Sequence, residues 1–77
     1  MRTTEDKNLF EAVPGETYII KDVVTDDDDM KAFLFRLGCY SGEPITVISK
    51  KRKQSIVVIK EGRYSLDNLL CEAIRVS

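Results

Sequence analysis

Short segments rich in β-branched and aromatic residues recur along this chain, and their recurrence constrains the fold more than any other feature. Such residues favour strands, because their side chains pack well on a pleated surface. Turn-forming pairs lie between the segments at Pro14 and Gly15, Ser41 and Gly42, and Glu61 and Gly62. We expect strands at 17–24, 43–50, 55–60, 63–66 and 73–76. Five short strands predict a mainly β fold, either a small closed barrel that hides its edges or an open α+β sheet.

The segment 28–37 differs from the others because its apolar residues follow a helical period. They fall at positions i, i+3, i+4 and i+7, as Met30, Phe33, Leu34 and Leu37. Aspartates at 26–29 provide an N-cap and place negative charge at the positive end of the helix dipole, and Gly38 suits the C-terminal end. We therefore expect a helix at 28–37 that plugs one end of the barrel, with Phe33 in the core. A short helical turn is expected at 67–71.

The length and charge of the chain bound its organisation. A chain of 77 residues has room for one domain, which we assign to residues 9–77, with residues 1–8 as a flexible N-terminus. A formal net charge of -1 provides no global attraction to nucleic acid. No apolar run approaches the roughly 20 residues of a membrane helix, and the first residues lack the apolar core of a signal peptide. We therefore expect a cytoplasmic protein.

Histidine is absent from the sequence. Its absence removes the commonest general acid–base residue and the commonest transition-metal ligand. A phosphate-binding loop and a nucleotide-binding fingerprint are absent as well. We therefore expect no enzymatic activity, no catalytic residue, no metal site and no cofactor.

Aspartates and cysteines are the remaining candidates for metal ligands. Consecutive side chains at a helix start point in different directions, so helix capping by residues 26–29 is favoured over a weak contact with a divalent ion. Cys39 and Cys71 form no CxxC pair, and two further strong ligands for a metal–thiolate site are not evident. Both cysteines are expected to be reduced and buried.

A basic run and an apolar run lie side by side at 50–53 and 56–59. The basic run is expected to form a solvated hairpin tip, with docking to an acidic protein patch and nucleic-acid binding as alternatives. The apolar run has apolar residues on both faces of a strand, because side chains alternate. One face fills the barrel, and the other is covered by the chain itself, by a partner or by a second copy. The predicted partner-binding residues are Lys50, Lys51, Arg52, Lys53, Val57 and Ile59.

Four segments carry a family resemblance. They are Val13-Pro14-Gly15-Glu16, Leu37-Gly38-Cys39-Tyr40-Ser41-Gly42-Glu43-Pro44-Ile45-Thr46-Val47, Arg63-Tyr64-Ser65-Leu66 and Ala73-Ile74-Arg75-Val76. In this order and spacing they resemble the ferrous iron transport protein A (FeoA) family. The resemblance implies an SH3-like barrel and a non-catalytic role in ferrous iron uptake. It implies contact with the cytoplasmic part of FeoB, a membrane transporter with a GTP-binding domain, and therefore only indirect contact with the membrane. Weak self-association remains open, and no nucleic acid is expected to bind.

Two other functions remain open. A similar domain forms the C-terminal part of iron- and manganese-responsive repressors, so one alternative is a free-standing metal-responsive regulatory domain. The sequence shows no winged-helix DNA-binding part, so we do not expect a complete repressor. The other alternative is an RNA-binding small barrel.

Overall fold

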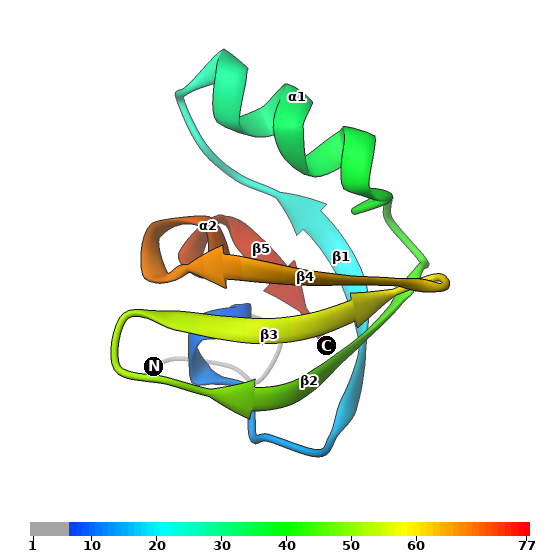
Figure 1. The fold of residues 1–77 in the computed structure, drawn as a ribbon. Helices are drawn as coiled ribbons and strands as arrows, with labels where there is room; N and C mark the ends of the chain where they lie inside the picture. The colour runs from blue at the N-terminus through cyan, green and yellow to red at the C-terminus, as the bar shows by residue number, and fades with distance from the viewer. Residues whose placement is uncertain (1–6) are drawn as a thin grey trace, which may run out of the picture.

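The computed structural model describes residues 7–77, so most of the expected flexible N-terminus, residues 1–6, lies outside the described residues. The described range contains five strands and two helices in the predicted order, and Figure 1 shows their arrangement. The elements are a 3-10 turn Leu9–Glu11 (η2), β1 Thr17–Val23, α1 Asp28–Leu37, β2 Pro44–Lys50, β3 Gln54–Ile59, β4 Gly62–Asp67, α2 Asn68–Ala73 and β5 Ile74–Val76. The mainly β fold and the bounds of α1 confirm the prediction, and α2 extends beyond the turn expected at 67–71. Among residues 7–77 no helix combines the length and apolar character needed to cross a bilayer.

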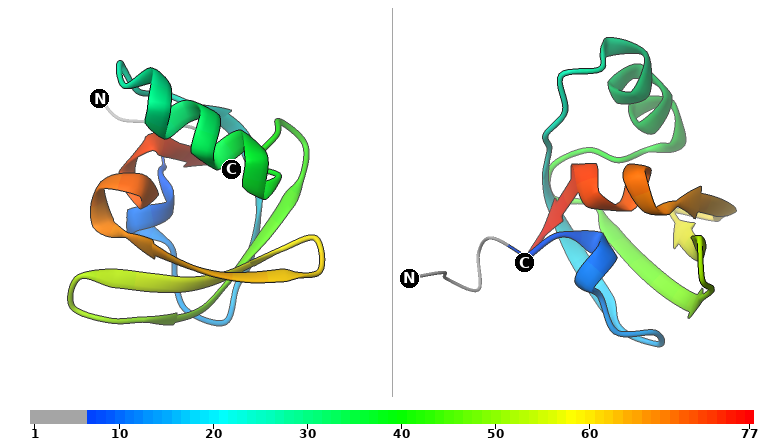
Figure 2. Two further views of the ribbon diagram at one scale, coloured as in Figure 1. Left: turned by 45° about the horizontal axis from the view of Figure 1, so that its top comes forward. Right: turned by 90° about the vertical axis from the view of Figure 1, so that its left-hand side faces the viewer.

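The strands form one antiparallel sheet in the order β4-β3-β2-β1-β5. Register shifts occur in β1 between Ile20 and Asp22 and in β2 between Val47 and Ser49. Such shifts bend a strand and increase its twist, so the sheet curls. Helix α2 connects the two outermost strands, β4 and β5, and the left view of Figure 2 shows the resulting ring. The curled sheet is therefore a small barrel.

The turn between β3 and β4 lies one residue earlier than the sequence indicates. Ile59 pairs with Gly62, so Lys60 and Glu61 form the turn, and Lys60 has the positive φ of 55°. Gly62 has a different task, because a Cβ atom there would lie 2.3 Å from the hydroxyl oxygen of Tyr64. The glycine therefore makes room for an aromatic ring and does not form the turn.

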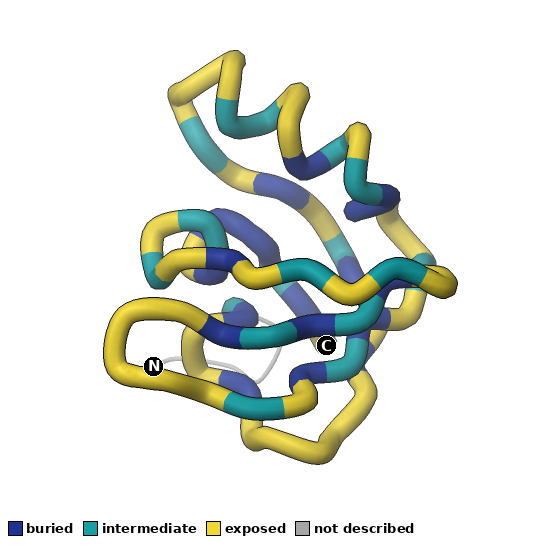
Figure 3. The backbone as a smooth tube through the Cα atoms, viewed as in Figure 1, coloured by how far each residue is buried: buried dark blue, intermediate teal, exposed yellow. Residues whose placement is uncertain are grey.

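The core lies inside the curled sheet, where alternate residues of the strands point inward. Helix α2 and η2 close the space with Leu9, Cys71 and Ala73, which are all buried. Figure 3 shows the alternation of buried and exposed positions along the strands. The expectation that Cys39 and Cys71 are buried free thiols is confirmed. The buried hydrophobic residues are Leu9, Ala12, Tyr18, Ile20, Val23, Leu34, Cys39, Ile45, Val47, Val57, Ile59, Leu66, Cys71, Ala73, Ile74 and Val76.

Helix α1 lies against the outside of the barrel, where it covers less of the core than predicted (Figure 1). Among its residues, all of which the structure describes, Leu34 alone is fully buried. Phe33, predicted in the core, is 38% exposed, whereas Phe35 packs against the core and stacks on Tyr40 with ring centroids 5.5 Å apart. The contact of the helix with the barrel is centred on Leu34, and Met30, Phe35 and Leu37 pack at its edges, so the helix is turned about its axis toward Phe35 and away from Phe33. Part of the apolar stripe of α1 therefore stays accessible.

Candidate functional site

The predicted basic hairpin tip is present and its backbone is fixed. Lys51, Arg52 and Lys53 are exposed at the turn between β2 and β3. The carbonyl oxygen of Arg52 accepts from Asn68 Nδ2 at 3.2 Å, and that of Lys53 accepts from the Asn68 N–H at 3.2 Å. The hairpin tip is thereby held at the start of α2, and three cationic side chains project from a fixed backbone.

Lys50 differs from its three basic neighbours. Its ammonium group donates to the carbonyl oxygens of Phe10 and Ala12, the latter at 3.1 Å. It also lies 5.3 Å from the ring centroid of Phe10, within the range of a cation–π contact. Lys50 therefore ties η2 to β2, and this contact competes with the partner-binding role predicted for it. Of the four predicted basic residues, only Lys51, Arg52 and Lys53 stay available as a cationic surface for a partner.

The two apolar residues predicted to bind a partner lie in the core. Val57 is 0% exposed and Ile59 is 1% exposed, so neither reaches a partner while the barrel is folded. They are the inward set of β3, because the register of the β2–β3 hairpin places Val57 opposite Val47 and Ile59 opposite Ile45. That prediction is corrected here.

The outward apolar residues of β3 are Ile56 and Val58, and both are half-buried. Val58 lies between Thr46 and Arg63 on the neighbouring strands, and Ile56 pairs with Ser65 of β4. Side chains of the neighbouring strands therefore cover part of Ile56 and Val58, and only the remainder of each side chain is exposed to solvent.

The aspartates at 26–29 cap α1. The Asp27 carboxylate accepts from the backbone N–H groups of Asp29 at 3.0 Å and Met30 at 3.1 Å, which satisfies two free donors of the first helical turn. Asp26, Asp28 and Asp29 are exposed. Within residues 7–77 no group of three or more acidic or cysteine side chains is arranged to hold a metal ion.

The two thiols are poor nucleophiles and poor ligands at neutral pH. Burial raises the pKa of Cys39 from 9.0 to about 11. Burial also raises the pKa of Cys71, although a hydrogen bond with Ser55 acts in the opposite direction. The Sγ atom of Cys71 donates to the Leu66 carbonyl oxygen at 3.8 Å. The thiolate is the reactive and metal-binding form, and both thiols stay protonated at neutral pH. Both groups therefore act as packing residues of the core.

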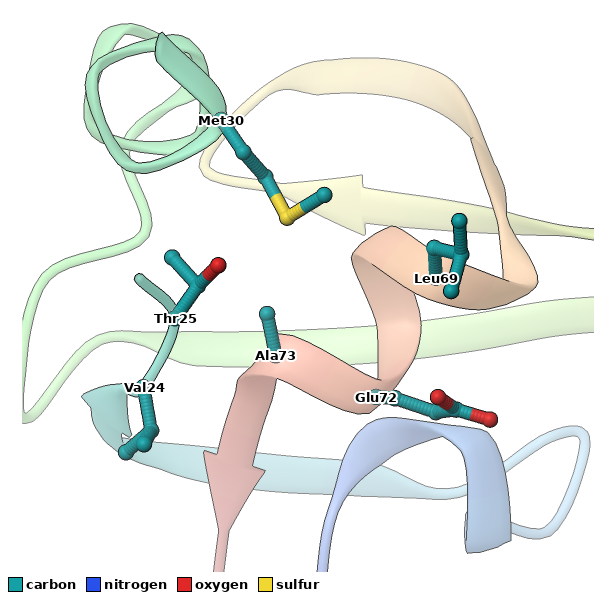
Figure 4. A pocket seen from close by; sticks show the side chains of 6 residues that line it. All are labelled: Val24, Thr25, Met30, Leu69, Glu72 and Ala73. Carbon is teal, nitrogen blue, oxygen red and sulfur yellow. The ribbon is translucent and has the colours of Figure 1, made fainter. Parts of the chain in front are cut away.

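A groove between α1 and α2 is a feature that the sequence did not indicate. It has a volume of about 290 Å³. Figure 4 shows Met30 reaching from α1 toward α2, with Leu69 and Glu72 on the α2 side. Leu69 is 66% exposed and Val24 is 52% exposed. The lining residues are Val24, Thr25, Met30, Leu69, Glu72 and Ala73.

A second hollow of about 310 Å³ lies beside this groove. It shares Val24 and Glu72 with the first and extends to Asn8 and Arg75. The two hollows therefore adjoin each other at Val24 and Glu72, beside α2.

Sequence signals for the groove exist, although they are weak. Val23 and Val24 are consecutive, so an extended chain buries one and exposes the other. Leu69, Leu70 and Cys71 are consecutive as well, and a single short helix does not direct three neighbours to one side. The surplus apolar residue of each run, Val24 and Leu69, lines the groove.

Comparison with known proteins identifies the family and the fold. The model of the FeoA domain family matches residues 7–77. No curated protein sequence matches the chain. A crystal structure of an iron uptake regulatory protein (FeoA) is similar with a TM-score of 0.82 at 20% identity, covering 91% of this chain and 93% of that one.

Two further structures extend the comparison. FeoA of Stenotrophomonas maltophilia, in complex with zinc, has a TM-score of 0.83 at 18% identity, covering 92% of this chain and 89% of that one. That protein is described as an SH3 domain protein and a candidate activating factor of bacterial ferrous iron transport. T. acidophilum IdeR has a TM-score of 0.84 at 21% identity; the match covers all of this chain, which spans 36% of that one. At these identities the likeness establishes the SH3-like fold, which confirms that prediction.

Proposed function

Since the chain belongs to the FeoA domain family, we propose that it is an accessory protein of ferrous iron uptake that works in the cytoplasm through contact with a FeoB-type transporter. The observation that carries this proposal is the family match, which covers residues 7–77. The description of the S. maltophilia protein as a candidate activating factor supports the same role.

The surface supports a role in binding more than a role in catalysis. Both thiols are buried with raised pKa values, so neither provides an accessible nucleophile. The exposed surface instead offers three cations on a fixed turn and exposed apolar side chains beside a groove. These are features of protein-binding surfaces. We therefore expect no turnover of GTP by the protein alone.

The decisive experiment is a binding measurement between the full chain and the cytoplasmic part of a FeoB-type transporter from the same cell. We expect reversible, saturable binding by surface kinetics. An unrelated acidic protein of similar size is the control for nonspecific attraction to the basic tip. Absence of binding to the transporter domain, or equal binding to the control protein, would overturn the proposal.

A second candidate function is a free-standing metal-responsive domain. The observation that favours it is the fold shared with IdeR, of which this chain spans 36%. Anaerobic titration with Fe(II), Mn(II) or Zn(II) tests it by calorimetry. We expect no tight one-to-one site, since the thiols are protonated and the carboxylates of residues 26–29 serve the start of a helix. Stoichiometric binding at low micromolar affinity would favour this second function instead.

A further inference from the structure

We propose that the groove between α1 and α2 binds a partner protein segment that inserts apolar side chains and places lysine or arginine beside them. The identity of the protein that supplies the segment rests on the proposed function, whereas the chemistry of the site rests on the groove itself. Five observations support the proposal: incomplete cover of α1, an apolar lining, an acidic surround, a second hollow beside the groove and the absence of a suitable segment in the chain itself.

The first observation is the incomplete cover of the apolar stripe of α1. Leu34 is buried in the barrel, but Met30 is half-buried and Phe33 is 38% exposed, one helical turn apart on the same side. Helix α1 lies outside the barrel in both views of Figure 2, and the groove opens between its first turn and α2. Met30 packs against the core with part of its side chain and also lines the groove, so this end of the stripe forms part of one wall.

The second observation is the lining. Leu69 and Val24 are among the most exposed large hydrophobic side chains that the structure describes, at 66% and 52%, and both line the groove. Clustered exposed apolar side chains mark interaction sites more often than isolated ones. Met30 adds a flexible side chain that adapts to different apolar guests. In Figure 4 its thioether points into the space between the two helices.

The third observation is the charge around the groove. Asp26, Asp28 and Asp29 are exposed along the chain between Thr25 and Met30, which both line the groove. Glu72 lies on the opposite wall. No ion pair within residues 7–77 involves any of these four carboxylates. An acidic surround favours a cationic partner and raises its association rate.

The fourth observation is a second hollow beside the groove. The hollow lined by Asn8 and Arg75 shares Val24 and Glu72 with the groove. Their volumes, about 290 and 310 Å³, lie at the lower end of the roughly 300–1,000 Å³ typical of ligand pockets. Two small adjoining hollows suit the successive side chains of a peptide segment better than one compact small molecule.

The chain itself supplies no matching segment. The basic tip of a second copy has cations at Lys51, Arg52 and Lys53, but the next residues, Gln54 and Ser55, are polar. The turn itself therefore has no apolar side chain for the groove, and the exposed Ile48 lies back within strand β2. The N-terminal residues 1–6 contain one arginine against two acidic residues. A different protein is therefore the occupant that the chemistry favours.

The test begins with a random peptide library displayed against the full chain, followed by fluorescence polarisation of the strongest peptide. We expect enriched peptides that combine apolar and basic residues and bind more weakly at high salt. Leu69→Ser should weaken the strongest peptide about tenfold, as for a central apolar contact. Asp28→Asn with Asp29→Asn should weaken it about threefold and flatten the salt dependence.

Matched variants control for loss of stability. Ile48→Ser removes an exposed apolar side chain on β2, outside the groove lining, and Glu61→Gln removes an exposed charge at the β3–β4 turn. Both should bind the peptide like the native chain. The proposal fails if no peptide is enriched, if the enriched peptides are acidic, if Leu69→Ser binds as tightly as the native chain, or if sedimentation shows that a second copy occupies the groove. Peptide binding without transporter binding would leave the groove established and refute the proposed transporter role alone.

Discussion

At the residue scale, Gly62 and Tyr64 form a coupled pair on β4. A Cβ at position 62 would lie 2.3 Å from the Tyr64 hydroxyl oxygen and 2.6 Å from the ring carbon that carries it. We expect Gly62→Ala to lower the free energy of unfolding by about 1–3 kcal/mol, because the rigid ring must leave its place. Urea denaturation measures the loss. In the background of Tyr64→Ala the same change should cost much less, whereas additive losses in the double variant would show that the ring is not the cause.

The pKa of Cys39 makes stability depend on alkaline pH. The neutral thiol is favoured in the fold, so the pKa rises from 9.0 to about 11. A raised pKa contributes stability that is fully present below pH 9 and is lost as the pH rises toward 11. We expect the free energy of unfolding to fall by up to about 2 kcal/mol across this window because of Cys39.

Other groups also titrate between pH 9 and 11, so the contribution of Cys39 has to be isolated with a variant that lacks its thiol. Cys39→Ala should lack this part of the decline, although it lowers stability overall by opening a small cavity. Urea denaturation at pH 8, 9 and 10 gives the two slopes. Parallel slopes for the native chain and Cys39→Ala would contradict the assignment.

At the element scale, Lys50 belongs to the basic run at 50–53 but serves to connect β2 to the segment around η2. Its ammonium group binds two carbonyl oxygens of the segment around η2, from Phe10 and Ala12. We expect Lys50→Met to lower the free energy of unfolding by about 1 kcal/mol and to increase amide exchange in η2. Lys51→Met, one residue along and without these contacts, is the matched control. Equal effects of the two substitutions would show that Lys50 is only another exposed cation.

The elements themselves were largely predictable, because each depends on local chemistry. Helix α1 has the predicted bounds, since an aspartate N-cap and a left-handed glycine at Gly38 fix both ends. The rotation of α1 about its axis was not predictable, because Phe33 and Phe35 are both apolar and only contact with the barrel decides which is covered. The outer placement of α1 likewise depends on tertiary packing, which periodicity does not encode.

At the scale of the whole molecule, the sequence pattern predicts one of the two candidate sites, the basic turn, and does not predict the other, the groove. The exposed turn of Lys51, Arg52 and Lys53 follows directly from a charged run between strands. Val57 and Ile59 were misassigned because a run of four apolar residues does not state which face is inward, and register alone decides it. The groove depends on two surplus apolar residues, Val24 and Leu69, which belong to different elements. Only the fold brings them together.

The charge distribution of the molecule leads to the last prediction. The net charge is only -1, but the aspartates at 26–29 lie at the start of α1 and the cations Lys51, Arg52 and Lys53 lie at the β2–β3 turn. Such separation orients a partner during approach more than it strengthens the final complex. We expect replacement of all three cations by serine to slow association with the cytoplasmic domain of a FeoB-type transporter, with a smaller effect on dissociation. The effect should shrink as salt screens exposed charge.

Surface-binding kinetics at two salt concentrations measures both effects, with thermal unfolding to verify that the triple variant stays folded. The fold should tolerate the change, because the turn is fixed by the backbone oxygens of Arg52 and Lys53 and not by their side chains. Lys60→Ser on the β3–β4 turn removes one cation elsewhere and also breaks its ion pair with Glu43, so it provides a partial control. If the triple variant associates as fast as the native chain, with the same salt dependence, the basic tip does not dock the partner and the groove between α1 and α2 remains the candidate docking site.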